Sequence, residues 1–313
     1  MLRYVLQRIG IAALTLLAII MLLFLLMELV PGTPFNEEKL SPEQVEQNLK
    51  LYGLDKPWPY RFAKYTLNML SGNFGISYVI SKNIPVMDLI KNRFPVTMRI
   101  GLQAIVLGTA LGLLLGIGAA LKHGSPLDTL CTFLSVICVS VPSYVFALCL
   151  SYLAGFKLGW FPLIYRVDQT FLSSVMPTIA LSLFPMASVA RFTRVEMLET
   201  LDSDFVQLAE SKGVTGFRLI FGHVLRNALI PVITVLGPMV VGLLTGSLVI
   251  EKIFSVPGIG QLLVTSIQTN DYNVIVVMSF IYSALYIAVM LVVDILYGII
   301  DPRIRITREE RDD

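Results

Sequence analysis

Six long apolar segments recur along the chain, separated by shorter polar connections. They comprise residues 9–30, 96–121, 127–156, 172–192, 229–250 and 274–300. A helix that crosses a bilayer needs about 20 predominantly apolar residues, and each segment meets that length. The pattern therefore predicts an all-α integral membrane protein, embedded in lipid, with about six transmembrane helices.

Basic residues are distributed unevenly between the two sides that these spans define. They gather before the first span, after the last one and on the connections that follow the second and fourth spans. The opposite short connections hold only Lys157, Arg166 and Lys252. The positive-inside rule assigns the richer side to the cytoplasm. Because an even number of spans brings both termini to one side, both are predicted to be cytoplasmic.

Two segments outside the spans are long enough to fold. Residues 31–95 follow the first span on the outer side, and their aromatic content is sufficient to fold against the outer face. Residues 193–228 form a cytoplasmic loop between the fourth and fifth spans. The predicted division of the chain is an N-terminal helix, the external region, a membrane core that includes this loop, and a cytoplasmic tail, with boundaries at 1–30, 31–95, 96–300 and 301–313.

Most of a patterned polar stretch, residues 204–231, lies within this cytoplasmic loop. Helical periodicity divides its first residues between two faces. The apolar face comprises Phe205, Leu208, Ala209 and the stem of Lys212, and the polar face comprises Asp204, Gln207, Glu210 and Ser211. Gly213 suits the left-handed turn that ends a helix. We expect Thr215 to cap a second helix that ends before Pro231.

This helix, turn and helix allow two interpretations. The apolar face could dock on another protein, or it could lie on the lipid surface beside the membrane. A helix bound to a lipid surface is expected to carry a denser basic face than this one, in which Asp204 and Glu210 stand beside Lys212 and Arg218.

Composition and charge exclude several protein classes. The chain of 313 residues is 55% hydrophobic and 15% charged, whereas an ordinary soluble domain is about 25% charged. A net charge of +2 gives no indication of a nucleic-acid partner. The sequence contains no GxxxxGK[ST] phosphate-binding loop, no HExxH and no GxSxG motif, and its three cysteines lack a metal-ligand spacing. We therefore predict no catalytic residue, metal site or cofactor within this chain.

Two features inside the spans carry structural information. Gly108, Gly112 and Gly116 recur every four residues, which lets a second helix approach closely. Asp294 is the deepest ionisable residue in the predicted spans. It fits either a structural hydrogen bond or ion pair, or a transport role, and no opposite charge on another span supports the latter.

Prolines interrupt the third, fourth and fifth spans at Pro142, Pro177, Pro185 and Pro238. The backbone carbonyls freed by such breaks are tolerated only beside protein or a water-filled cavity, so the breaks indicate either a nearby pathway or simple helix kinks. Polarity alone suggests a candidate translocation path along Ser140, Ser143, Tyr144, Thr178 and Ser182.

Short motifs throughout the chain resemble those of one membrane protein family. They stand in that family's order at residues 53–57, 72–77, 93–97, 124–128, 190–194, 204–209, 212–213, 225–231, 251–254, 257–260, 271–272 and 301–305. The resemblance is to the permease subunits of ATP-binding-cassette (ABC) importers, in the oligopeptide/dipeptide/nickel branch and of the OppB/DppB type.

In that family the cytoplasmic loop is the EAA loop, whose short helices dock into a groove on a separate ATPase subunit. The resemblance implies a coupling role for Asp204, Phe205, Gln207, Leu208, Ala209, Glu210, Lys212, Gly213, Arg218 and Arg226. One departure is that Gln207 stands where the family has its signature glutamate. An ion pair specific to that glutamate is therefore in doubt.

The resemblance also implies a function and a set of partners. We expect a non-catalytic permease subunit that translocates oligopeptides or dipeptides across the cytoplasmic membrane of a prokaryote. Its expected partners are a homologous second permease of the OppC/DppC type, two ABC ATPase subunits that bind ATP and Mg, and an extracytoplasmic peptide-binding protein. The same architecture could import nickel chelates, haem or glycans. A secondary transporter, the competing class, would show inverted repeats or buried charge pairs.

Overall fold

The computed structural model describes residues 2–29, 43–44, 47, 55–244 and 248–300. The predicted tail, 301–313, and part of the predicted external region lie outside these residues. Most of the described residues are helical, and the only β-type pairing among them is an isolated bridge between Ile76 and Pro85. Six of the described helices are long and apolar enough to cross a membrane. The predicted all-α membrane fold with about six spans is therefore confirmed.

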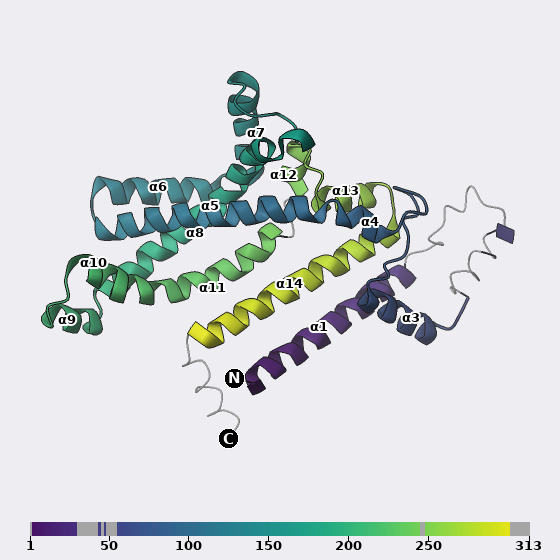
Figure 1. Ribbon diagram of the computed structural model, residues 1–313, viewed down its shortest axis with the longest axis horizontal. Coiled ribbons are helices and arrows are strands. Elements are labelled where there is room, and N and C mark those ends of the chain that lie inside the picture. The colour runs from purple at the N-terminus through teal and green to yellow at the C-terminus, as the bar shows by residue number, and fades with distance from the viewer. Residues whose placement is uncertain (1, 30–42, 45–46, 48–54, 245–247, 301–313) are drawn as a thin grey trace. The chain divides into compact units, whose positions relative to one another are not determined.

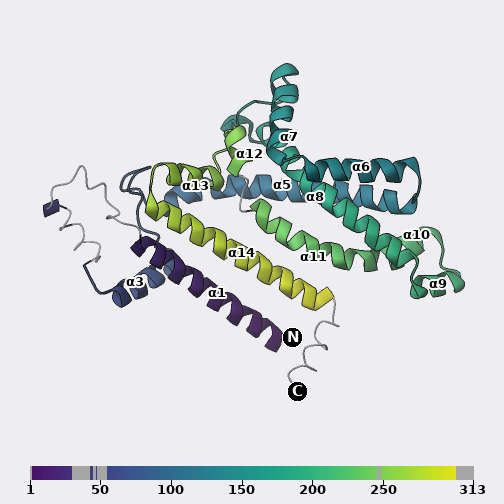
Figure 2. The same ribbon diagram turned by 180° about the vertical axis from the view of Figure 1, so that it is seen from behind.

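The described chain divides into two compact units. The first contains Met1–Val96 and Pro257–Leu291, and the second contains Thr97–Val256 and Val292–Asp313. Helices of the first unit are α1 (Leu2–Leu29), α3 (Trp58–Ser71), α4 (Val86–Lys91), α13 (Ile259–Gln268) and the first part of α14 (Tyr272–Ile300). Ile20 and Leu23 of α1 share a core with Val277 of α14, and both views show these two helices side by side (Figures 1 and 2).

An irregular segment of the first unit is held by a buried carboxylate. Asp271 is fully buried, and its side chain accepts a hydrogen bond from the Ser77 hydroxyl at 2.5 Å. It also accepts from the backbone amides of Tyr78, Val79 and Ile80 at 3.0–3.3 Å. The amides of Val79 and Ile80 lie outside helices and strands, so they depend on Asp271 for their hydrogen bonds. The carboxylate thus fixes the conformation of residues 77–80.

We expect Asp271→Ala to destabilise the first unit by about 3 kcal/mol, because it leaves the buried Ser77 hydroxyl and two partly buried amides without this acceptor. The measurement is thermal unfolding in detergent, together with the rate at which protease cuts residues 72–81. Asp88→Ala is the matched control, since Asp88 is exposed at the first turn of α4. Equal unfolding temperatures for the two variants would refute this account.

The second unit contains most of the remaining helices. After α5 (Phe94–Leu121) come α6 (Pro126–Ser140), α7 (Ser143–Leu150), the π-helical η2 (Ser151–Lys157), the 3-10 turn η3 (Val167–Gln169), α8 (Thr170–Leu201), α9 (Asp204–Ser211), α10 (Gly216–Leu219), the π-helical η4 (Ile220–Val224), α11 (Leu225–Leu244) and α12 (Leu248–Ile253). In this unit α9 and α10 lie at the opposite end of α8 from α7 (Figure 1).

The glycine-rich face of α5 packs directly on α8. A Cβ atom added to Gly108, Gly112 or Gly116 would lie 2.6 Å from a backbone carbonyl oxygen of α8, a distance too short for any side chain. These carbonyls belong to Ser182, Met186 and Ala190, which are likewise spaced by four residues. The predicted close approach is therefore confirmed, and the structure identifies α8 as the helix that makes it.

The prolines behave differently from one another. At Pro142 the single span predicted over residues 127–156 is instead two helices, α6 and α7 with η2, bent by 100°. At Pro177, Pro185 and Pro238 a break of the helix is wrong, because α8 and α11 continue through them, and the predicted alternative of a kink remains. The Pro185 ring packs at Gly108, where the absent side chain leaves room for it. Neighbouring helices can thus accommodate a proline inside a membrane helix.

Candidate functional site

The loop that follows α8 folds as a short helix with a defined end. Asp204 lies in the first turn of α9, where a negative charge favours the helix dipole. Gly213 has φ +84°, which confirms the predicted left-handed turn. The amide of Val214 then donates to the carbonyl of Ala209 at 3.1 Å and closes the helix end. The chain is therefore turned back sharply after α9.

One face of α9 is buried against the rest of the second unit. Val206 is 1% exposed and Ala209 is 8% exposed. They share an apolar core with Met197 of α8, Ala120 of α5 and Val224 of η4. Ala209, which the periodicity groups with Phe205 and Leu208, instead faces inward beside Val206. The loop is thus anchored to the ends of α5, α8 and α11 by its own small core.

The opposite face of the loop leaves large apolar side chains uncovered. Phe205 and Leu208 of α9 are 45% and 55% exposed. Phe217 and Phe221, on α10 and η4, are also exposed, and their rings stack with centroids 4.0 Å apart. Exposed apolar clusters with polar neighbours are typical of sites that bind another protein or a membrane surface. We call Phe205, Leu208, Phe217 and Phe221 the outer apolar cluster.

The polar residues predicted to take part in coupling are all exposed. They are Asp204, Gln207, Glu210, Lys212, Arg218 and Arg226. Gln207 donates from its side-chain amide to the carbonyl of Asp202 at 3.4 Å. A glutamate carboxylate has no proton to donate there at neutral pH, so the glutamine makes a contact that the family's glutamate would lack.

The second predicted helix begins where expected but does not end where expected. Thr215 is the residue before α10, although its side chain makes no capping hydrogen bond. The predicted end before Pro231 is wrong, because α10, η4 and α11 follow one another without a gap and Pro231 lies inside α11. The loop is therefore joined to α11 through continuous helix.

The candidate path residues fall into two groups. Ser140, Ser143 and Tyr144 are exposed at the bend between α6 and α7, and Thr178 and Ser182 are buried on α8. Thr178 donates to the Gln103 side chain at 3.1 Å, and Ser182 donates to the carbonyl of Ile179 at 2.9 Å. The described structure does not gather all five around one cavity.

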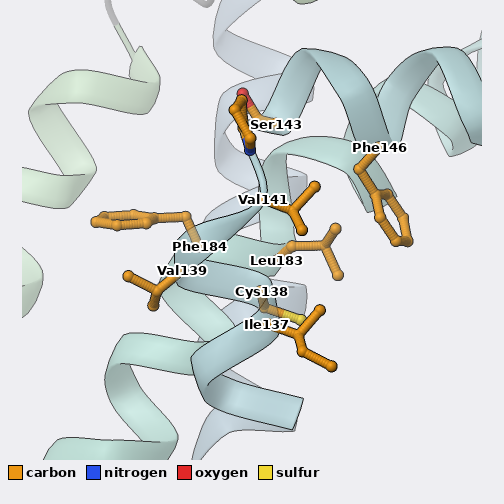
Figure 3. Close-up of a pocket in the computed structure, with 9 residues that line it drawn as sticks. Ile137, Cys138, Val139, Val141, Ser143, Phe146, Leu183 and Phe184 are labelled. Carbon is orange, nitrogen blue, oxygen red and sulfur yellow. The ribbon is translucent and has the colours of Figure 1, made fainter. Parts of the chain in front are cut away.

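A pocket of about 220 Å³ lies at the bend (Figure 3). Of the candidate path residues it includes Ser143, and the rest of its lining is mainly apolar. The residues around it are Ile137, Cys138, Val139, Val141, Pro142, Ser143, Phe146, Leu183 and Phe184. The bend thus combines interrupted helix with a small hollow, as expected beside a pathway or a partner surface.

Sequence reasoning missed a buried carboxylate in the second unit. Glu251 of α12 is 4% exposed and accepts a hydrogen bond from the Thr97 hydroxyl at 2.7 Å. The fifth predicted span ends at residue 250, so the sequence pattern places Glu251 in the connection that follows it. Asp294, the ionisable residue singled out from the sequence, is only partly buried. The signal that could have found Glu251 is its position directly after an uninterrupted apolar segment.

Comparison with known proteins identifies the family. Residues 112–306 match the inner membrane component of binding-protein-dependent transport systems, and residues 1–101 match the N-terminal part of such membrane components. The chain belongs to this family. The permease is 46% identical over 306 residues to the dipeptide transport system permease protein DppB of Lactococcus lactis subsp. cremoris, with 98% of this chain and 100% of the relative covered.

Further relatives align with this chain over their whole length. The permease is 40% identical to DppB of Bacillus subtilis, covering 99% of this chain and all of the relative. It is 37% identical to the oligopeptide transport system permease protein OppB of Escherichia coli, covering 97% of this chain and all of that relative.

A solved structure supports the fold. The crystal structure of an amino acid ABC transporter with histidines gives a TM-score of 0.55 at 15% identity, covering 67% of this chain and 94% of that one. The protein is thus a multi-pass permease subunit of a binding-protein-dependent ABC importer, and it works with other transporter subunits.

Proposed function

We propose that this permease carries dipeptides or oligopeptides across the cytoplasmic membrane, with both of its termini in the cytoplasm. A homologous second permease completes the pathway, and an extracytoplasmic peptide-binding protein delivers the cargo. Two ABC ATPase subunits bind ATP and Mg and supply the energy, while this chain catalyses nothing. The names of full-length relatives at 37–46% identity support peptides as the cargo.

The observation that carries the coupling role is the two-sided packing of α9. Its inner residues, Val206 and Ala209, are buried in the core shared with α5 and α8, and its outer residues, Phe205 and Leu208, are exposed. An apolar helix face that inserts into a groove is a recurring way for proteins to bind one another. We assign the outer apolar cluster as the surface on which an ATPase docks.

This arrangement explains how a movement of the ATPase reaches the membrane helices. A docked subunit holds α9 from outside, while the small core joins α9 to the ends of three long helices. Packed interiors resist deformation, so a displacement of α9 moves those helix ends with it. Closure of two ATPases would then change which side of the membrane the pathway faces.

The cargo is tested with the complete complex reconstituted in lipid together with its binding protein. We expect a mixture of dipeptides and oligopeptides to raise ATP hydrolysis several-fold, because cargo delivered from outside favours the closed ATPase state. The matched control omits the binding protein and should remove the stimulation. Stimulation by a nickel chelate, haem or a glycan, without any response to peptides, would contradict the peptide assignment.

A further inference from the structure

A partly buried ion pair joins the α5–α6 turn to α8. Asp128, in the first turn of α6, is 5% exposed. Arg194 of α8 donates from Nε to Oδ1 at 2.5 Å and from Nη2 to Oδ2 at 2.8 Å. Two parallel hydrogen bonds fix the relative orientation of the two groups as well as their distance. The contact is therefore both strong and directional.

The turn itself is arranged around the same carboxylate. The amide of Gly124 donates to Asp128 Oδ2 at 3.1 Å, and His123 Nδ1 lies 3.0 Å from that oxygen. The Ser125 side chain accepts from the amide of Asp128 and caps α6. These contacts hold Asp128 in place independently of its hydrogen bonds with Arg194. The start of α6 can therefore move little relative to Arg194 while the pair is intact.

The pair lies beside the core that anchors α9. Met197, one turn after Arg194 on α8, is fully buried and packs in that core with Val206 and Ala209. Ala120, near the end of α5 and just before the turn, belongs to the same core. Among the described residues of this core, none comes from α6. The Asp128–Arg194 pair is thus a polar link between the base of the loop and α6.

α6 leads away from this link to the bend. It ends at Ser140, and the chain turns by 100° before continuing in α7. The pocket of about 220 Å³ is lined from both sides of that bend and by Leu183 and Phe184 of α8. A rotation of α6 relative to α8 would therefore alter the pocket.

We propose that the Asp128–Arg194 pair is a positioning element that carries the movement of α9 to α6 and its bend. It keeps ATP hydrolysis and cargo movement linked, and this inference rests on the proposed docking of ATPases at the outer apolar cluster. The pair touches neither cargo nor nucleotide in this role. Its directional hydrogen bonds transmit a rotation of one helix to the other. An apolar contact between smooth surfaces would let the helices turn past each other more easily.

The test compares transport with hydrolysis in the same proteoliposomes. Complexes with Asp128→Asn or Arg194→Gln are purified through the ATPase subunit, so that only assembled permease is measured. We expect peptide uptake per ATP hydrolysed to fall by about tenfold, as for the loss of a typical coupling energy between two sites. Arg194→Lys keeps the charge but not the paired geometry. Its peptide uptake per ATP should therefore lie between that of these variants and that of wild type.

An exposed pair of the same residue types provides the matched control. Arg166 lies 3.0 Å from Asp168, and both side chains are more than half exposed. Arg166→Gln and Asp168→Asn should leave uptake per ATP at the wild-type value. If all three variants of the Asp128–Arg194 pair hold the ATPase and keep the wild-type ratio, the inference is overturned and the docking proposal is unaffected. Failure of docking itself is detected separately, by variants of Phe205 and Leu208.

Discussion

Changing Phe205 and Leu208 together to aspartate should release the ATPase from this permease without unfolding it. Both side chains are about half exposed, so their replacement leaves the buried contacts of Val206 and Ala209 intact. In the proposed complex, each of the two aspartates would place a carboxylate in the apolar groove of the ATPase. A loss of about 2 kcal/mol at each anchor is typical of interface hot spots. Together the two losses would weaken binding by about a thousandfold.

The measurement is the amount of ATPase that remains with the tagged permease after purification from membranes. Ser211→Asp with Thr215→Asp is the matched control, because it adds two negative charges to exposed positions of the same loop that are not predicted coupling residues. This control should retain most of the ATPase, since the apolar anchors remain. If the Phe205 and Leu208 variant binds the ATPase as tightly as wild type, the docking surface is wrongly assigned.

Replacing Gly112 by valine should prevent α5 and α8 from packing. The new Cβ atom would lie 2.6 Å from the carbonyl oxygen of Met186 and 2.8 Å from Cβ of Val189. Both neighbours are close to the α8 backbone, so the helices must separate rather than a side chain swing aside. Overpacking usually costs about 1–3 kcal/mol, and we expect a loss at or above the upper end here because the Gly108 and Gly116 contacts are lost with it.

Thermal unfolding in detergent and the yield of monodisperse protein measure this effect. Gly118→Val is the control on the same helix, because a Cβ at Gly118 would meet only Leu127 Cδ2, at 3.9 Å. The control should unfold close to the wild-type temperature, whereas Gly112→Val should give little folded protein. Similar unfolding temperatures for the two variants would show that the close helix approach is unimportant for stability.

Local patterns were sufficient to predict an all-helical membrane protein with about six spans and the turn after α9. Apolar length identifies a membrane helix directly, and Gly213 can adopt positive φ at no steric cost. The spacing of Gly108, Gly112 and Gly116 predicted close packing, because a face without side chains lets a second helix approach. It did not identify α8 as the partner, because spacing on one helix carries no information about the other.

The bend and the two faces of α9 required the structure. A proline indicates that a helix is disturbed, but the 100° change of direction at Pro142 depends on what packs around α6 and α7. In α9, residues 205, 206, 208 and 209 are all apolar. Periodicity then gives one wide stripe, and only tertiary packing decides which half of it is buried.

Long-range polar pairs were also beyond sequence reasoning. Asp128 and Arg194 are 66 residues apart, and Asp271 and Ser77 are 194 apart. Nothing in the local pattern around either aspartate indicates its partner. Each acidic residue lies near a span end, where a solvated surface position is an equally good explanation before the fold is known.

The most direct test of the account is uptake of a labelled dipeptide or oligopeptide by proteoliposomes that contain the complete complex. We predict uptake that requires ATP on the ATPase side, the binding protein on the other side and the intact Phe205 and Leu208 surface. Uptake that continues without ATP, or a complex that transports another cargo but no peptide, would contradict it.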